Sequence, residues 1–466
     1  MLVIHIVDKH NMSRFQPIIR NTDYLFPPSI NDWLPEVHLA RFVVEIVEQL
    51  DLGEMERAYK GTGSAPFHPA LLLSVLTYGY ATGVFSSRKL EAATYDSVAF
   101  LYVAANLHPD HDTLNTFRKR FLPQIEGLMV QVLLIARTMG VLKLGNIALD
   151  GTKVHANASK HSALSYGHIK QLEEQLQVEV KKLLALAEEA DNEKIPEGIN
   201  LPDEITRRED RLKAIGQAKV KIEDRARERY EQEQAEYQGK LAKREAKAAD
   251  TGKAPRGKAP VPPQEGAKDN DQINLTDEES RIMKTAGGGF EQCYNAQLAV
   301  DMESYLITNT NVVQAANDKQ QVETMLGELV ALPAPLGKVN TLVADTGYFS
   351  ENNVRACGEN KITPLIAVSR ESHHPDPLER FTEPPPLAEG ATEVDKMRHR
   401  LKTIEGGALY AKRKSTVEPV IGCVKSVLGF RQFMLRGLEN VNGEWNLVAL
   451  AWNMKRMFNL KGAVLA

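Results

Sequence analysis

The sequence is poor in cysteine and aromatic residues, and its charges nearly balance. Only three of the 466 residues are cysteine, at Cys293, Cys357 and Cys423. Their odd number and wide spacing exclude a disulfide framework and a metal site built from cysteine. This usage is typical of a reducing cytoplasm, where we expect the protein. The hydrophobic share of 43% excludes general disorder, and the length suggests about three domains.

Long apolar runs are also missing. The longest stretch without Lys, Arg, Asp or Glu is 61–87, and polar residues and glycines interrupt its apolar part, 70–85. That part is shorter than the ~20 apolar residues that a membrane span needs. The first residues carry Asp8, Lys9 and Arg14, which is unlike a signal peptide. We therefore expect a buried helix at 70–85 and no membrane partner.

Positive charge is concentrated in one stretch of the chain. The net charge of −4 gives no global indication of a nucleic-acid partner. Between 398 and 436, however, only Glu405 and Glu418 oppose nine basic residues: Arg398, Arg400, Lys402, Lys412, Arg413, Lys414, Lys425, Arg431 and Arg436. Such a surplus predicts either a phosphate-binding face or an ordinary solvated face.

The amino-terminal part of the chain, as far as about position 130, has the apolar spacing of short helices. Pro69 suits the first turn of one of them. A later helix begins near Leu114, with Asp112 or Thr113 as its N-cap. Three basic residues on that helix are candidates for exposed DNA contacts: Arg118, Lys119 and Arg120. The pattern suits a helix-turn-helix-like module or any small helical bundle, and we expect a helical DNA-binding domain at 1–140.

A different composition begins near residue 166. Apolar residues recur at three- and four-residue steps in two runs, with one gap at Glu179, and charged residues fill most other places. Turn chemistry at 195–202 separates the two runs. This pattern predicts an antiparallel helical hairpin of coiled-coil character over 166–249, followed by a Pro-rich flexible linker at 250–268. We expect 166–285 to be an insertion into another domain.

The remaining segments, 141–165 and 286–466, predict an α/β domain with a mixed sheet. A buried strand ends at Asp150, two strands at 295–301 and 305–313 form a hairpin, and a helix covers 318–332. A second buried strand ends at Asp345, followed by a helix at 351–360 and a strand at 362–368. The carboxyl-terminal end of the chain is helical. Both acids therefore lie at carboxyl ends of strands, where ligands bind in such sheets.

Asp150, Asp345 and Glu418 are the candidate catalytic and metal-binding residues. Clustered carboxylates repel one another, and oxygen-only ligands favour Mg²⁺ or Mn²⁺. Glu418 lies near the start of a helix, where Pro419 is tolerated and Ser415 or Thr416 is the expected cap. Lys425 follows two helical turns later on the same face, and Gly422 leaves that face open. The alternatives are ordinary ones: strand-end acids are often turn formers, and a first-turn acid favours the helix dipole. His155 and His161 are expected on the surface, and Tyr348, Phe349, Trp445 and Trp452 in the core.

Several motifs in this order resemble those of bacterial insertion-sequence transposases of the DDE type. They are the 25–36 opening, His108-Pro-Asp with 117–120, Asp150-Gly-Thr-Lys, Tyr294-Asn-Ala-Gln with Asp301, and 344–350. A further motif places a Tyr, an Arg, a Glu and a Lys together, here Tyr410, Arg413, Glu418 and Lys425. The step from Arg413 to Glu418 is one residue longer than usual, so Arg413 or Lys414 fills the basic position.

The resemblance implies an RNase H-like catalytic domain in which Asp150, Asp345 and Glu418 bind two Mg²⁺ ions. Water would attack DNA at the terminal inverted repeats, and the freed 3′-hydroxyl would attack target DNA. Lys425 is expected to hold a phosphate and Tyr410 to contact flanking DNA, with a homodimer joining two ends. Three alternatives remain: a catalytically silent DNA-binding or repressor protein, an assembly protein organised by the hairpin, and a repair or resolution nuclease on the same scaffold.

Overall fold

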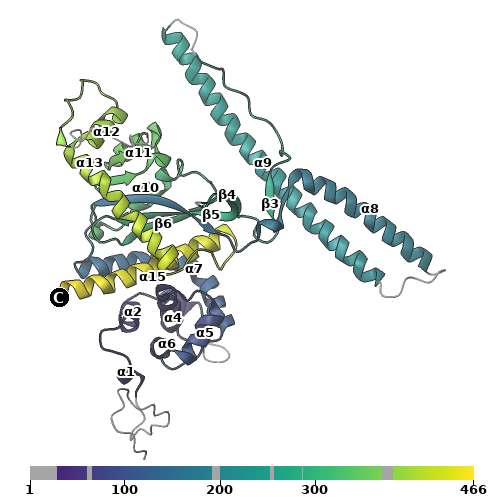
Figure 1. The fold of residues 1–466 in the computed structure, drawn as a ribbon, viewed down its shortest axis with the longest axis horizontal. Helices are drawn as coiled ribbons and strands as arrows, with labels where there is room; N and C mark the ends of the chain where they lie inside the picture. Colours follow the sequence, from purple (N-terminus) through teal and green to yellow (C-terminus); the bar gives the residue numbers. More distant parts are fainter. Residues whose placement is uncertain are drawn as a thin grey trace, which may run out of the picture.

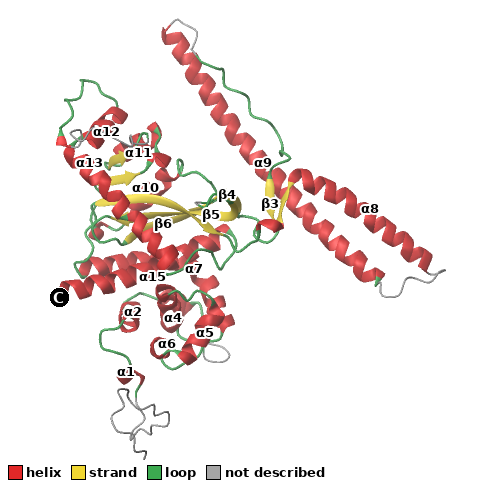
Figure 2. Cartoon of the chain, viewed as in Figure 1, coloured by secondary structure: helices red, strands yellow, loops and turns green. Residues whose placement is uncertain are grey.

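A mixed sheet lies at the centre of the computed structural model, which describes residues 29–59, 66–190, 200–251, 257–285, 287–369 and 381–465. Its strands are β1 (Asn146–His155), β4 (Arg281–Lys284), β5 (Phe290–Asp301), β6 (Ile307–Val313), β7 (Thr341–Ala344) and β8 (Thr363–Ile366). The order is β4-β5-β1-β7-β8, with β6 also paired to β5. β5 runs antiparallel to β1, and β7 and β8 run parallel to it and to each other. The predicted mixed α/β architecture is confirmed (Figures 1 and 2).

The predicted hairpin of β5 and β6 is present, and Asp301 explains how it turns. The Asp301 carboxylate accepts hydrogen bonds from the Ser304 backbone N–H at 2.8 Å and from the Ser304 hydroxyl at 2.6 Å. Tyr305 follows with a φ of 65°, a left-handed conformation in which only a tight turn usually places a bulky residue. Asp301 therefore stabilises the turn between β5 and β6.

β1 is longer than predicted. The prediction ended this strand at Asp150, but β1 continues to His155 because β5 offers an antiparallel partner as far as Cys293. On its other edge, β1 pairs with β7 only over Asn146–Ala148. Asp150 thus lies in the middle of a strand, immediately beyond the end of its parallel pairing.

Helices cover both faces of the sheet. Seven precede it: α1 (Ile30–Trp33), α2 (Leu39–Val47), α3 (Gly53–Arg57), α4 (Pro69–Thr82), α5 (Ser87–Asp96), α6 (Val98–Val103) and α7 (His111–Thr138). The later ones are α10 (Gln321–Ala331), α11 (Glu351–Glu359), α12 (Glu393–Lys402), α13 (Ile404–Ala411), α14 (Val417–Gly422) and α15 (Leu438–Leu465). α7 and α15 pack together beside the sheet, with α1–α6 beyond them (Figure 1). Asp110 caps α7 by accepting from the Thr113 N–H at 2.6 Å, so the predicted cap at Asp112 or Thr113 is wrong by two residues or more.

Arg118 is not an exposed DNA-binding candidate. Its side chain is 4% exposed and donates to the Tyr80 hydroxyl at 2.9 Å and the Phe85 carbonyl at 3.1 Å. The buried Glu444 carboxylate of α15 lies 3.9 Å away and accepts from the same hydroxyl at 2.6 Å. Arg118 follows the buried Leu114 by one helical turn, so its side chain faces the core. There its contacts with Tyr80 of α4 and Glu444 of α15 link these two helices to α7.

α4 is the buried helix predicted at 70–85. Eleven of its residues are buried, including Leu72, Leu73 and Tyr80. Among the described residues, no single helix is long and apolar enough to cross a membrane. Only α4 and α5 together have sufficient length and composition, as a pair bent by 96°.

The predicted helical hairpin is formed by α8 (Tyr166–Ala190) and α9 (Leu201–Thr251), which project from the rest of the molecule (Figure 1). Residues 195–199 of its predicted turn lie outside the described residues. A small separate core joins the proximal halves and contains Ile169, Leu172, Leu176, Ile215, Ala218, Ile222 and Ile273. Two short strands, β2 (Ala163–Ser165) and β3 (Gln272–Asn274), pair at its root.

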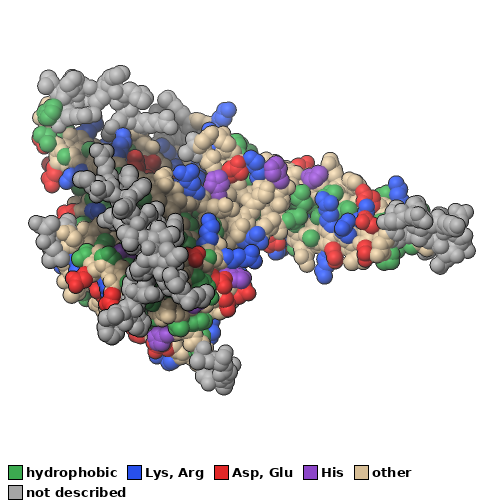
Figure 3. Space-filling view, turned by 60° about the horizontal axis from the view of Figure 1, so that its bottom comes forward, with side chains coloured by type: hydrophobic (Ala, Val, Ile, Leu, Met, Phe, Trp, Pro, Cys, Tyr) green, Lys and Arg blue, Asp and Glu red, His purple; other side chains and the backbone are tan. Residues whose placement is uncertain are grey.

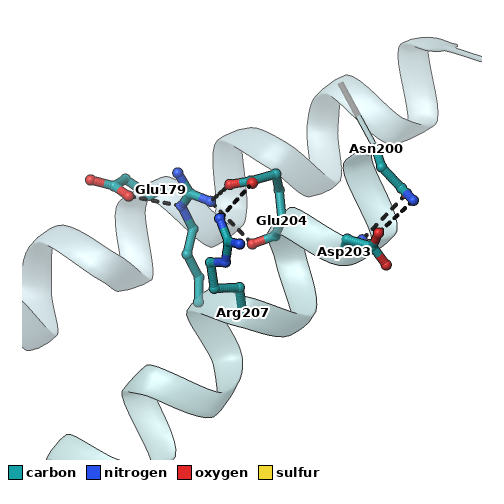
Figure 4. A network of polar contacts seen from close by, with 6 residues as sticks. Glu179, Asn200, Asp203, Glu204 and Arg207 are labelled. Carbon is teal, nitrogen blue, oxygen red and sulfur yellow. Dashed lines mark hydrogen bonds and ion pairs between the residues drawn. The ribbon is translucent and has the colours of Figure 1, made fainter. Parts of the chain in front are cut away.

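Ion pairs replace apolar contacts farther along the hairpin. Glu179, the gap in the apolar pattern, accepts from Arg208 of α9 at 2.9 Å (Figure 4). Beyond it, Leu184 and Leu186 are 45% and 51% exposed. The described part of the predicted linker returns along α9, where Arg244 donates to the carbonyls of Gly257 and Lys258.

Candidate active site

The first two candidate acids lie level with each other on neighbouring parallel strands. Ala148 of β1 pairs with Val343 of β7, and two residues beyond each lie Asp150 and Asp345. Asp150 Oδ1 accepts from the Gly151 N–H at 2.8 Å. Asp345 Oδ1 accepts from the Gly347 N–H at 2.8 Å and so caps the short 3-10 helix Thr346–Tyr348. The fold therefore brings together two carboxylates that are far apart in the sequence.

Burial and charge perturb Asp150. Its pKa is raised from 3.8 to about 6, first by burial and further by the neighbouring charge of Asp345, against the opposing effect of Arg413. A carboxyl group with such a pKa holds its charge at appreciable cost unless a cation lies beside it.

Arg413 joins Asp150 to Glu418. Its Nη1 lies 3.1 Å from Asp150 Oδ2, and its Nη2 lies 3.0 Å from Glu418 Oε1. The Arg413 side chain is only 8% exposed, whereas Glu418 is 48% exposed. Lys414 is exposed, so Arg413, rather than Lys414, occupies the basic position that the sequence left open.

Two of the three acids, Asp150 and Glu418, thus contact one guanidinium group, and Asp345 lies close enough to Asp150 to raise its pKa. Within the parts of the chain that the structure describes, no three His, Cys, Asp or Glu side chains form a ready-made metal site. The Arg413 guanidinium forms ion pairs with both Asp150 and Glu418.

Glu418 and Lys425 do not share one continuous α-helix. Pro419 lies in the first turn of α14 and Thr416 is its N-cap residue, as predicted. The Thr416 side chain makes no capping hydrogen bond, and both the Ser415 and the Thr416 hydroxyl donate to the Lys412 carbonyl. A π-helix at Cys423–Val427 then follows α14 directly. This wider turn breaks the 3.6-residue period on which the shared face depended.

Lys425 reaches back to β1, close to Asp150. Its ammonium group donates to the Thr152 hydroxyl at 2.9 Å and to the Lys153 carbonyl at 2.8 Å, and burial lowers its pKa. A side-chain carbon at Gly422 would meet nothing within 4 Å, so the surface between Glu418 and Lys425 is open, as predicted.

A fourth carboxylate, Asp318, was missed by the sequence analysis. Its Oδ1 accepts from Asn295 Nδ2 at 2.6 Å and from Gln297 Nε2 at 2.8 Å, and Lys153 Nζ lies 4.0 Å away. Gln297 also accepts from the buried Tyr348 hydroxyl. Two amides at alternate positions of an apolar strand were an available signal, because they share one face. Asp318 itself had no recognisable signal in the sequence, because it lies in the loop before α10.

The other candidates contact the acids less directly, and Tyr410 lies close enough to Arg413 to contribute to the raised pKa of that guanidinium. Tyr410 is half-buried against the hydrophobic core. Lys119 is exposed, and the Arg120 guanidinium lies over the Tyr59 ring at 5.2 Å. Tyr348 and Trp445 are buried core residues, as predicted. His161 is exposed and His155 is half-buried, in line with the surface prediction for the former.

Gly151 is required by this packing. A side-chain carbon there would lie 2.7 Å from Asp318 Oδ1 and still closer to Gln297 Nε2. We expect Gly151→Ala to lower the free energy of unfolding by about 1–3 kcal/mol through overpacking and to displace Asp150. Thermal unfolding measures the first effect. Gly216→Ala in α9 is the matched control, since its added carbon meets nothing and Ala favours a helix by about 1 kcal/mol. Equal losses in both variants would contradict this account.

The sheet order and the carboxylates beside its central strands define an RNase H-like α/β protein. Comparison with known families agrees. A model described as the transposase DDE domain matches residues 259–454, and one described as a transposase domain (DUF772) matches residues 28–120. The two matches together indicate an insertion-sequence transposase of the DDE type, and the resemblance seen in the motifs is confirmed.

The two matched ranges leave out residues 121–258. That gap contains β1 with Asp150, as well as the whole of α8 and α9. The matched DDE range contains Asp345 and Glu418. No curated protein and no solved structure matches the chain.

Proposed function

We propose that this transposase cuts DNA at the terminal inverted repeats of its insertion sequence and joins the freed 3′-hydroxyl ends to target DNA. The observation that supports the proposal is that Arg413 contacts both Asp150 and Glu418, while the charge of Asp345 acts on Asp150. The two family matches indicate the nucleic-acid substrate.

Asp150, Asp345 and Glu418 would hold the divalent ions, Mg²⁺ or Mn²⁺. Their oxygen chemistry fits a hard cation, and the raised pKa of Asp150 marks a place where positive charge is needed. Glu418 fits only after it gives up its contact with Arg413. When bound, the ions would activate the attacking oxygen and stabilise the leaving oxygen.

The chain's own cations would position the DNA. Lys425, held beside β1 by Thr152, and the exposed Lys414 would contact phosphates near the cut, and Tyr410 flanking DNA. Lys119 and Arg120 remain candidates on α7, whereas the buried Arg118 is withdrawn. We assign repeat recognition to the helical domain at 1–140, catalysis to 141–165 and 286–466, and a DNA or protomer contact to 166–285, with a homodimer joining two ends.

Strand cleavage tests the proposal. The probe is a labelled duplex that carries the inverted repeat read from DNA flanking the coding region. With Mg²⁺, the wild-type chain is expected to nick it at the repeat end, while Asp345→Ala leaves it intact. Nicking that survives Asp345→Ala, or that needs no metal, would defeat the assignment.

The alternative is a catalytically silent DNA-binding or repressor protein derived from a transposase. It predicts specific binding to the same duplex without metal-dependent nicking. The absence of a ready-made three-ligand metal site among the described residues is compatible with it, whereas the presence of all three acids, two of them in contact with Arg413, argues for the enzyme.

A further inference from the structure

A second cationic site lies where the helical hairpin meets the sheet. A cavity of about 450 Å³ opens between α9 and the strands β3 and β4, and Arg225, Arg229 and Arg281 contribute to its lining. Its volume lies within the range of ordinary ligand sites. Lys and Arg side chains also gather where the hairpin leaves the body of the protein (Figure 3).

Two of these arginines approach each other without a carboxylate between them. Arg225 Nη2 and Arg281 Nη1 both donate to the Glu278 carbonyl, at 2.8 and 3.0 Å. Neither side chain forms an ion pair with any described residue. Arg225 Nη1 is buried and has no hydrogen-bond partner among the residues that the structure describes. A buried, unsatisfied guanidinium nitrogen is costly, so this arrangement lacks an acceptor.

The nearby carboxylates have other partners. Asp271 pairs with Arg229 at 2.7 Å, Glu278 with Lys221, and Glu279 accepts from the Leu438 N–H at 2.7 Å. Asp277 accepts from the Tyr294 hydroxyl at 2.8 Å. Glu228 is exposed and also lines the cavity. Burial and the charge of Arg225 lower the pKa of Arg281 to about 10, against the weaker opposing effects of Tyr294, Glu279 and Asp277.

We infer that Arg225 and Arg281 bind a phosphate group of the DNA backbone at the root of the hairpin. This inference rests on the proposed function. A forked guanidinium pair matches phosphate oxygens in geometry and charge, and one oxygen would satisfy the unpartnered Arg225 nitrogen. Gln314, which already accepts from Arg281 at 2.7 Å, adds an amide donor at the same wall.

The pocket lies farther along the sheet than the catalytic acids, beside β4. Arg281 pairs with Cys293 of β5, which pairs in turn with His155 of β1. His155 follows Asp150 by five residues, so strand geometry places the two sites roughly 20 Å apart. That separation corresponds to roughly six nucleotides along one DNA strand. The inserted hairpin would thus hold DNA that extends away from the cut.

The salt dependence of binding tests this contact. The full chain is titrated against the labelled terminal-repeat duplex over a series of KCl concentrations, with fluorescence anisotropy as the readout. Each phosphate contact contributes about 0.9 to the slope of log K against log salt. We expect Arg225→Gln and Arg281→Gln each to reduce the slope by about that amount.

Arg227→Gln is the matched control, because Arg227 lies on the same helix, is 68% exposed and pairs with Asp224. It removes the same charge and should leave the slope unchanged. Arg225→Lys is the second variant, which keeps the charge and should retain most of the slope. An equal change in Arg225→Gln and Arg227→Gln would overturn the inference.

Two further outcomes separate the sources of phosphate and the two proposals. If inorganic phosphate raises the thermal stability of the wild type but not of Arg225→Gln, while the DNA slope stays the same, the pocket takes a free anion and the DNA assignment is wrong. A reduced slope without any metal-dependent nicking supports the pocket and defeats the transposition chemistry. Normal nicking with an unchanged slope supports the transposition chemistry and defeats the phosphate pocket.

Discussion

Asp150→Asn should abolish strand cleavage while leaving the fold at least as stable as before. The substitution removes a carboxylate that would hold the metal, so we expect the nicking rate to fall about 1,000-fold or more, the equivalent of roughly 4 kcal/mol of barrier. The amide keeps an oxygen that can accept from Arg413, which now contacts Asp150 at 3.1 Å. Nicking of the terminal-repeat duplex measures the activity.

The pH dependence of unfolding gives this prediction a second readout. Because the pKa of Asp150 is raised to about 6 in the folded chain, the folded state holds that proton more tightly than the unfolded state. In metal-free wild type, this group's contribution to stability is therefore greatest below pH 3.8 and is lost as pH rises to about 6. The loss is at most about 3 kcal/mol.

The amide introduced by Asp150→Asn cannot titrate, so the difference in unfolding free energy between variant and wild type should grow in the variant's favour over this pH interval. Asp301→Asn is the control for the activity, since burial also raises the pKa of Asp301 but this side chain stabilises a turn remote from the acids. We expect Asp301→Asn to lower the free energy of unfolding and to leave the nicking rate unchanged. Retained nicking in Asp150→Asn, or a stability difference independent of pH, would contradict the role given to Asp150.

The elements that hold these acids were largely predictable. Apolar runs marked β1, β7 and β8, and the turn between β5 and β6 was visible at 302–305. The paired apolar stripes of α8 and α9 predicted their hairpin because each local pattern agreed with the structure around it. In these segments, the apolar periodicity of the sequence and the packing of the folded chain favour the same secondary structure.

Predictions failed where a distant partner decides the structure. The end of β1 depends on the length of β5, and the burial of Arg118 depends on Glu444, which lies near the other end of the chain. The π-helix at Cys423–Val427 has no signature in residue spacing. Asp318 enters the acidic cluster from a loop, so its neighbours Asn295 and Gln297 become visible only after folding.

Arg413→Gln should have the other large effect, because Arg413 lies between Asp150 and Glu418, two carboxylates that would bind metal. Removing it in Arg413→Gln leaves the largely buried Asp150 beside Asp345 without a cation. We expect the metal-free chain to lose about 3 kcal/mol of unfolding free energy, as when one partner of a buried ion pair is deleted. The Glu418 contact adds little to this loss, since that side chain is 48% exposed and water screens it.

The same substitution should strengthen metal binding. In the wild type, a divalent ion must displace the guanidinium from Glu418, whereas in Arg413→Gln the carboxylates are available at once. We expect the affinity for Mn²⁺, measured calorimetrically without DNA, to rise at least tenfold, and saturating Mn²⁺ to restore most of the lost stability. Lys414→Gln is the matched control, because it removes an adjacent but exposed charge. If both variants bind Mn²⁺ alike, or if Arg413→Gln binds it more weakly, Arg413 does not stand in for the metal. Its contacts with Asp150 and Glu418 would then serve to orient the ligands, and both would have to persist in the metal-bound site.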